Sequence, residues 1–259
     1  MTLSSYTLQL NTQALTQIGL NLQAVINLTA LPLPLQKSLQ ASSKNYHQYN
    51  QLLLLANGGK TFWQYFKRYQ QQHSDIFNSS DPIDDYCKLK SRQFIGQLLA
   101  KDCYELIYPF SKKSNFEQVI DLQALGKMVG WHHSTPFRLG INHKWGSWFA
   151  YRTVILMKSN FEITEIVETN VVETNTAETK HPCLPCEKMP CVQNCPAKAL
   201  SLNQLDLKKC LSYRLLDKSI CKDKCVARLA CPVANKQQYS LEQIQYHYLN
   251  SLRVIKELK

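Results

Sequence analysis

Eight cysteines crowd into one segment of this 259-residue chain, and no other feature restricts its fold as much. Of the ten cysteines, eight lie between Cys183 and Cys231. No apolar run approaches the roughly 18 residues that a membrane helix needs, and residues 1–36 lack the basic start of a signal peptide. The sequence therefore predicts a cytoplasmic chain without a membrane segment. Its clustered cysteines are interpreted as metal ligands rather than as disulfides.

The spacing of these cysteines predicts two iron–sulfur sites. The first motif reads Cys183-x2-Cys186-x4-Cys191-x3-Cys195-Pro196, and the second has Cys210 followed by Cys221-x3-Cys225-x5-Cys231-Pro232. A cubane 4Fe-4S cluster takes three thiolates from one tight loop, while the fourth cysteine, followed by proline, reaches the other cluster. One predicted ligand set is therefore Cys183, Cys186, Cys191 and Cys231. The other is Cys195, Cys210, Cys221 and Cys225.

Zinc is the alternative metal, because four-thiolate zinc sites also use closely spaced cysteine pairs. The first motif has two more residues before Cys191 than the bacterial ferredoxin pattern, and the second half has longer gaps. Each motif ends in Cys-Pro, and each of these cysteines is expected to bind the cluster of the other motif. Zinc chemistry does not require such endings, so the pattern favours two 4Fe-4S clusters.

The rest of the chain has the pattern of a mixed α/β (α+β) domain. Apolar runs at 51–56, 103–109 and 149–157 predict strands, and helical spacing at 60–72, 84–100 and 116–129 predicts helices, with Asp81 as an N-cap. An acidic, threonine-rich stretch at 160–181 is typical of a linker, or of an edge strand and turn. We therefore expect a domain at 1–159, a linker at 160–181 and a cysteine module at 182–259.

One turn in the first domain has the composition of a binding site. Between Leu139 and Arg152 it gathers two tryptophans, a histidine, two glycines and an arginine. Aromatic faces and a close-approaching glycine backbone suit a flat cofactor, but they equally suit a well-packed turn around buried tryptophans. Cys87 and Cys103 have no Cys or His neighbour in the sequence and are interpreted as packing residues.

Taken together, these segments resemble two related families. The cysteine motifs, with Lys209-Cys210-Leu211-Ser212-Tyr213, resemble the ferredoxin half of epoxyqueuosine reductase, a cobalamin-dependent enzyme of tRNA queuosine synthesis. The segments 81–84, 140–152 and 238–246 resemble the CblC-type cobalamin-trafficking chaperone.

The resemblance implies a nitroreductase-like core that holds a corrinoid, followed by a ferredoxin-like module with two clusters. It places His143, Gly146, Trp148 and Arg152 at the corrinoid pocket, with Arg152 near a reducing thiol cosubstrate. The reductase's catalytic acid has no matching position, and Asn142-His143-Lys144 stands where its His-Pro is usual.

Three functions follow as hypotheses. The first is an oxidoreductase, a cobalamin-dependent reductase if the resemblance holds, that relays electrons through two clusters to a corrinoid or another acceptor. The second is a ferredoxin-like electron carrier that docks a redox partner protein. The third is a relative of epoxyqueuosine reductase that binds tRNA, which agrees with a net charge of +11, from 30 Lys+Arg against 19 Asp+Glu.

Overall fold

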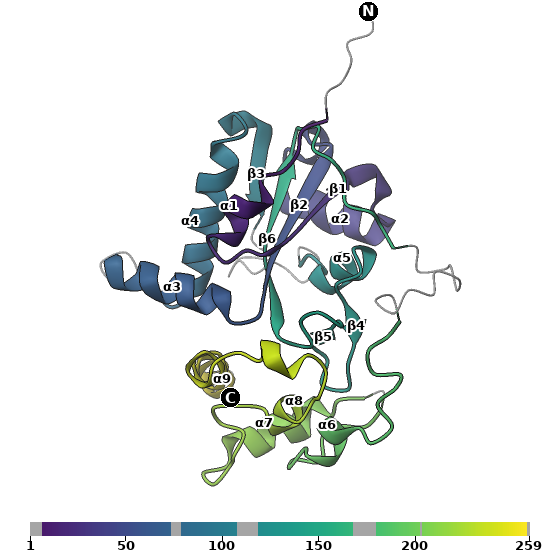
Figure 1. Ribbon diagram of the computed structural model, residues 1–259, viewed down its shortest axis with the longest axis vertical. Helices are drawn as coiled ribbons and strands as arrows, with labels where there is room; N and C mark the ends of the chain where they lie inside the picture. The colour runs from purple at the N-terminus through teal and green to yellow at the C-terminus, as the bar shows by residue number, and fades with distance from the viewer. Residues whose placement is uncertain (1–6, 74–78, 108–118, 168–179, 203, 258–259) are drawn as a thin grey trace, which may run out of the picture. The chain divides into compact units, whose positions relative to one another are not determined.

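The structure is a computed structural model, and it describes residues 7–73, 79–107, 119–167, 180–202 and 204–257. The chain forms two compact units, shown with the rest of the chain in Figure 1. Unit 1 comprises residues 1–129 and 150–169, and unit 2 comprises residues 130–149 and 170–259. No described helix combines the length and the apolar character needed to cross a membrane.

Unit 1 is built on a four-stranded sheet with the order β1-β2-β6-β3. The strands are β1 (Leu22–Asn27), β2 (Gln51–Gly58), β3 (Tyr104–Ile107) and β6 (Phe149–Met157). Strand β1 pairs antiparallel with β2, with Leu22 opposite Ala56, and β3 pairs antiparallel with β6, with Tyr104 opposite Met157. The mixed α/β fold that the sequence predicts is therefore confirmed.

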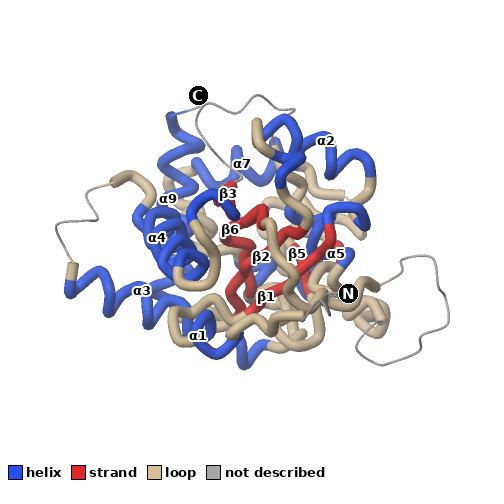
Figure 2. The backbone as a smooth tube through the Cα atoms, turned by 90° about the horizontal axis from the view of Figure 1, so that it is seen from above, coloured by secondary structure: helices blue, strands red, loops and turns tan. Residues whose placement is uncertain are grey.

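The apolar runs that predicted β2 and β6 reflect the central position of these strands. Every residue of β2 is buried, because helices cover the sheet on both sides. Helices α3 (Thr61–Gln72) and α4 (Pro82–Gly96) lie on one side, and α2 (Leu33–Ser42) and α5 (Leu122–Met128) on the other (Figures 1 and 2). A short helix, α1 (Thr12–Thr16), precedes β1.

The helix boundaries follow local capping. Helix α5 begins after Asp121, whose Oδ1 accepts a hydrogen bond from the Ala124 N–H at 2.9 Å. Residues 116–118 of the expected helix lie outside the described residues. Helix α4 has Pro82 at its first position as expected, but Asp81 makes no capping bond. Its Oδ2 instead accepts the Ser80 hydroxyl at 2.8 Å.

Unit 2 consists of short elements and one long helix around the cysteine loops. They are the paired strands β4 (His133–Ser134) and β5 (Gly140–Ile141), and the helices α6 (Pro190–Gln193), α7 (Leu207–Leu215), α8 (Val226–Leu229) and α9 (Leu241–Glu257). Trp148, Tyr239 and Ile244 form its buried apolar cluster.

The compact units differ from the expected domains at two places. Residues 130–149 belong with the cysteine loops, because Trp148 is buried among unit 2 side chains and Arg228 donates to the Ser147 backbone carbonyl. Residues 160–167 of the expected linker pack onto unit 1, where Phe161 is 3% exposed and Thr164 bonds to Val25. The rest of that linker, 168–179, lies outside the described residues, as do 108–109 of the expected third strand.

Candidate functional site

The cysteine loops of unit 2 bring the eight clustered cysteines together in two groups. Burial raises the pKa of Cys183 to about 11, and the nearby thiols of Cys231, Cys191 and Cys186 add to this rise. We call these four residues the first thiol set. Cys231 comes from the end of α8, far along the chain from the other three members, so the long-range partner expected from the spacing lies beside them in the structure.

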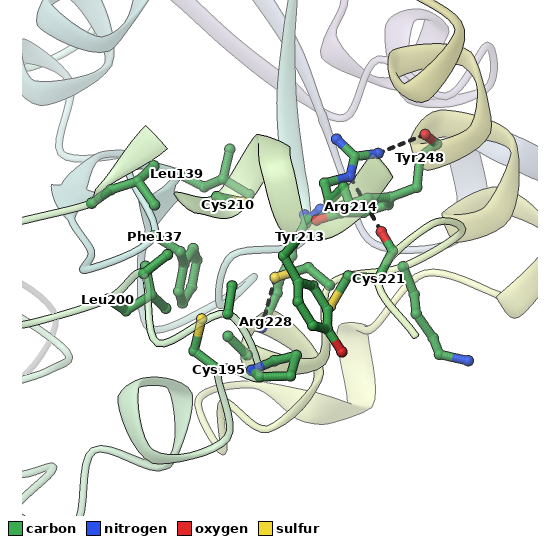
Figure 3. Close-up of a pocket in the computed structure, with 17 residues that line it drawn as sticks. Phe137, Leu139, Cys195, Leu200, Cys210, Tyr213, Arg214, Cys221, Arg228 and Tyr248 are labelled. Atoms are coloured by element: carbon green, nitrogen blue, oxygen red, sulfur yellow. Dashed lines mark hydrogen bonds between the residues drawn. The ribbon is translucent and has the colours of Figure 1, made fainter. Parts of the chain in front are cut away.

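The remaining four cysteines, Cys195, Cys210, Cys221 and Cys225, form the second thiol set. Burial raises the pKa of Cys210, and the neighbours that contribute next are the thiols of Cys225, Cys195 and Cys221, with Arg214 opposing them. All four line one cavity of unit 2 (Figure 3). Cys195 belongs to the first motif in sequence, yet it lies with the second motif in space.

The cavity beside the second thiol set is small and largely apolar. Its volume is about 160 Å³, below the roughly 300–1,000 Å³ of pockets for drug-sized organic ligands. Phe137, Leu139, Leu200 and Leu205 contribute apolar walls. A compact group bound through sulfur therefore suits this cavity better than a large planar cofactor does.

Backbone amides point at several of the sulfurs. The Arg228 N–H donates to Cys225 Sγ at 3.4 Å, where Cys225 caps the start of α8. The amides of Val226, Val192 and Val233 hydrogen-bond the thiols of Cys221, Cys191 and Cys231, and each bond opposes the rise in thiol pKa that burial causes. Hydrogen bonds of this kind favour the thiolate, which is the form that binds metal.

Tight backbone turns hold the cysteine loops in place. Met189, Lys198 and Ala234 adopt the left-handed region with φ of 37°, 49° and 47°. Each lies within three residues of a member of a thiol set. Such conformations cost about 1–2 kcal/mol per residue, so the surrounding contacts must impose these turns.

Two buried arginines flank the thiol sets, and the sequence reasoning did not identify them. Arg214 is 8% and Arg228 9% exposed, and both line the cavity of the second thiol set. Their spacing from the cysteines could have indicated this position. Arg214 lies four residues after Cys210 on α7, and Arg228 lies three residues after Cys225. Side chains at these separations share one face of a helix.

No group of three or more Cys, His, Asp or Glu side chains in the described ranges is arranged to hold a single metal ion. A tetrahedral zinc site needs four ligands on one ion, with Zn–S distances of about 2.3 Å. In this structure the sulfurs of neither thiol set are arranged around one point as a single zinc ion requires.

The four residues expected at a corrinoid pocket are divided between the two units, with three in unit 2 and Arg152 in unit 1. The Nε2 atom of His143 lies 2.7 Å from the carbonyl oxygen of Lys180. The guanidinium carbon of Arg228 lies 4.1 Å from the centroid of the Trp148 ring. A Cβ on Gly146 would meet the Val233 carbonyl oxygen at 2.3 Å. These three lie in unit 2 and pack against its own residues.

Arg152 lies in the interior of unit 1. Its Nε donates to Asn57 Oδ1 at 2.6 Å, and its guanidinium lies 4.5 Å from the centroid of the Phe62 ring. It is 8% exposed, and its Nη2 has no hydrogen-bond partner among the described residues. Arg152 is therefore built into the core beside β2 and α3.

Comparisons with known proteins give fold likenesses at low sequence identity. No protein-family model matches the sequence, and no curated protein matches it. Epoxyqueuosine reductase from Bacillus subtilis is 14% identical, with a TM-score of 0.48 over 90% of this chain and 66% of that one. An epoxyqueuosine reductase solved with an epoxyqueuosine-modified tRNA-Tyr stem loop is 12% identical, with a TM-score of 0.49 over 90% and 66%.

This chain thus spans about two thirds of the length of those reductases. The B12-trafficking protein CblC from C. elegans, a homologue of human MMACHC, is 14% identical and has a TM-score of 0.52 over 91% of this chain and 88% of that one. The chain is therefore similar in fold to CblC.

Proposed function

We propose that this protein is an iron–sulfur oxidoreductase, in which unit 2 is a ferredoxin-like module for two 4Fe-4S clusters and unit 1 a nitroreductase-like core. The observation that carries the proposal is the grouping of eight cysteines into two sets of four, with Cys195 and Cys231 exchanged between the motifs. The exchange is the arrangement expected of paired cubane sites.

The donor set fits this cofactor. A cubane binds its four thiolates through four different irons, so the sulfurs need not converge on one point as they must around a single zinc ion. Each set supplies four thiols and no other ligand type, and amide hydrogen bonds to Cys191, Cys221, Cys225 and Cys231 favour their thiolate forms. When bound, such clusters supply one-electron transfer at low potential.

The protein's own residues prepare these sites in three ways. The thiols must lose their protons before they bind metal, so loading should release protons and improve as the pH rises toward the raised thiol pKa values. Apolar side chains around the second thiol set keep water from the sulfurs. Arg214 and Arg228 place fixed positive charge beside them.

Metal analysis after anaerobic purification tests the proposal. We expect about eight irons and eight acid-labile sulfides per chain, with broad absorption near 400 nm, as cubane clusters require. A Cys103→Ser variant is the control, because Cys103 belongs to neither set and should keep the full iron content. Stoichiometric zinc in place of iron would refute the proposal.

A tRNA-modifying function is the second candidate, and the charge distribution favours it. Unit 2 holds 16 of the 30 Lys and Arg but only 8 of the 19 Asp and Glu. An epoxyqueuosine reductase has been solved with a tRNA stem loop, and phosphate contacts would make binding here depend on salt, because they release counterions. Binding of a tRNA anticodon stem loop that weakens steeply between 50 and about 200 mM salt would support this function. An acidic redox partner is the competing explanation of the same charge.

Cobalamin as the electron acceptor is a separate proposal that rests on the family resemblance. Equilibrium dialysis of hydroxocobalamin against the cluster-loaded protein measures it directly. Retention of about one cobalamin per chain would support a cobalamin-dependent reductase. If the cluster-loaded protein retains no cobalamin, the electron-carrier function becomes the favoured hypothesis.

A further inference from the structure

Two buried arginines of unit 2 line the cavity of the second thiol set. Arg214 donates from Nε to the Cys221 carbonyl at 3.2 Å and from Nη2 to the Tyr248 carbonyl at 2.8 Å (Figure 3). Its Nη1 donates to Ser251 Oγ at 2.9 Å. Arg228 donates to the Ser147 carbonyl and hydroxyl, and its guanidinium stacks on Trp148.

Neither guanidinium forms an ion pair with a carboxylate in the described part of the chain. Burying a charge is costly unless an opposite charge or hydrogen bonds compensate for it. Arginine stays protonated at any ordinary pH, so it cannot escape this cost by losing its proton. The hydrogen bonds described above compensate for part of this cost, and the nearby cysteines would become anionic when they lose their protons to bind metal.

The two arginines are distributed unequally between the thiol sets. Both arginines line the cavity that the four cysteines of the second set share, and no cysteine of the first set lines it. The Arg214 Nε donates to the Cys221 carbonyl, and the Arg228 backbone N–H donates to Cys225 Sγ. Arg228 also contacts the first set, because its carbonyl accepts a hydrogen bond from the Cys231 N–H at 3.2 Å. The second set therefore has both arginines beside it, whereas of these two only Arg228 contacts the first.

We infer that Arg214 and Arg228 make the site of the second thiol set the electron sink of unit 2, with a higher reduction potential than the site of the first set. A cluster with four thiolates is anionic and gains one more negative charge on reduction, so a nearby buried cation favours the reduced form. This inference rests on the proposed iron–sulfur function.

The transfer that follows is a single-electron step between the two sites. With clusters bound at both sites, an electron that a one-electron reductant delivered to the first site would pass to the second, so that the first would be reoxidised as the second was reduced. No bond forms or breaks and no proton needs to move, because both guanidinium groups stay charged throughout.

A redox titration of the loaded full-length protein, followed by electron paramagnetic resonance, tests the order of the two sites. Cys186→Ser and Cys210→Ser identify the signals, since each alters one member of one set without involving the exchanged cysteines. We expect the signal assigned through Cys210 to appear at the higher potential. Equal potentials, or a first site that is reduced before the second, would overturn the inference.

Charge-removing variants test the cause. Arg214→Gln should lower the potential of the second site and leave the first nearly unchanged, while Arg228→Gln should lower both. We expect shifts near tenfold in the one-electron equilibrium constant, which corresponds to about 59 mV. Lys209→Gln is the matched control, because it removes an exposed charge next to Cys210 that solvent already screens.

Arg214→Lys and Arg228→Lys separate charge from structural support. Lysine keeps the positive charge but loses the forked hydrogen bonds, so the potentials should stay near those of the wild type even if stability falls. Two results would contradict the inference. One is a lowered potential in the lysine variants, which keep the charge and lose only the hydrogen bonds. The other is an unchanged potential in glutamine variants that carry both clusters. Absence of iron from the wild type would instead refute the underlying iron–sulfur function.

Discussion

At the scale of single residues, Trp148 illustrates how a composition typical of a ligand site can serve packing. Its side chain is 1% exposed, and its ring lies 5.4 Å from that of Tyr239 in a T-shaped arrangement. Arg228 covers the indole and ties the preceding residue, Ser147, to the cysteine loops. The indole thus anchors residues 130–149 within unit 2.

Trp148→Ala should therefore lower the free energy of unfolding of unit 2. We expect a loss of about 3–5 kcal/mol, the usual cost of deleting a large buried side chain, measured by denaturant unfolding. Trp145→Ala is the matched control, because Trp145 is only half-buried and should cost clearly less. Unchanged stability combined with lost cobalamin binding would show that Trp148 is a pocket wall instead.

The buried thiol of Cys87 gives unit 1 a pH-dependent stability. Burial raises the pKa of Cys87 to about 12, with Arg152 partly opposing the rise. The folded state therefore holds this proton more tightly than the unfolded state, whose thiol titrates near 9. The contribution to stability is complete below pH 9 and is lost as the pH rises toward 12.

Alkylation measures the same property. In the native protein at pH 8, iodoacetamide should label Cys103, which is partly exposed, well before Cys87, because the thiolate is the reactive form. Between pH 9 and about 11, the free energy of unfolding should fall less in a Cys87→Ala variant than in the wild type. Equal labelling rates for the two cysteines in folded protein would contradict this prediction.

At the scale of elements, the exchange of Cys195 and Cys231 ties the two cysteine motifs to each other. Cys195→Ser should remove about half of the iron by damaging the site of Cys210, Cys221 and Cys225, because a cubane depends on all four thiolates. Cys231→Ser should damage the other site. Iron content and the site-specific resonance signals measure the result. Loss confined to the motif that carries the substitution would show that the motifs do not exchange ligands.

The turn at Gly146 joins two segments of unit 2 at close range. Its φ of +57° disfavours any other residue, and an added Cβ would overlap the Val233 carbonyl oxygen. Gly146→Ala should destabilise unit 2 by about 1–2 kcal/mol from the backbone conformation alone, with more from the overlap. Gly96→Ala is the control, since Gly96 lies in α4 and its Cβ would meet only the Tyr104 hydroxyl at 3.2 Å. Thermal unfolding compares the two.

At the scale of the whole molecule, the chain passes from unit 1 to unit 2 and back before it reaches the eight clustered cysteines. A fragment that begins near residue 181 lacks Ser147 and Trp148, on which Arg228 depends for its hydrogen bonds and stacking. We expect residues 181–259 alone to hold little iron, whereas residues 130–259 should hold far more. Equal iron in the two fragments would show that the cysteine loops form their sites without residues 130–149.

Much of this organisation can be predicted from the sequence because local spacing carries it. The apolar runs at 51–56 and 149–157 indicated β2 and β6, since central strands are buried on both faces. The aromatic residues of α3 repeat at helical spacing, and the Cys-Pro endings indicated the exchange of cysteines between motifs. For the strands and the helix, the signal lies within the element that it determines, and for the cysteines it lies in the fixed spacing of two short motifs.

The tertiary structure decided what depends on residues far apart in the chain. Only the fold places Arg228 over the Trp148 ring, and Arg152 on Phe62 in the core of unit 1. Only the fold leaves the two arginines beside the second thiol set, with one of them also near the first. These arrangements follow from long-range packing and from the electrostatics of buried charge, which the spacing of residues along the chain does not encode.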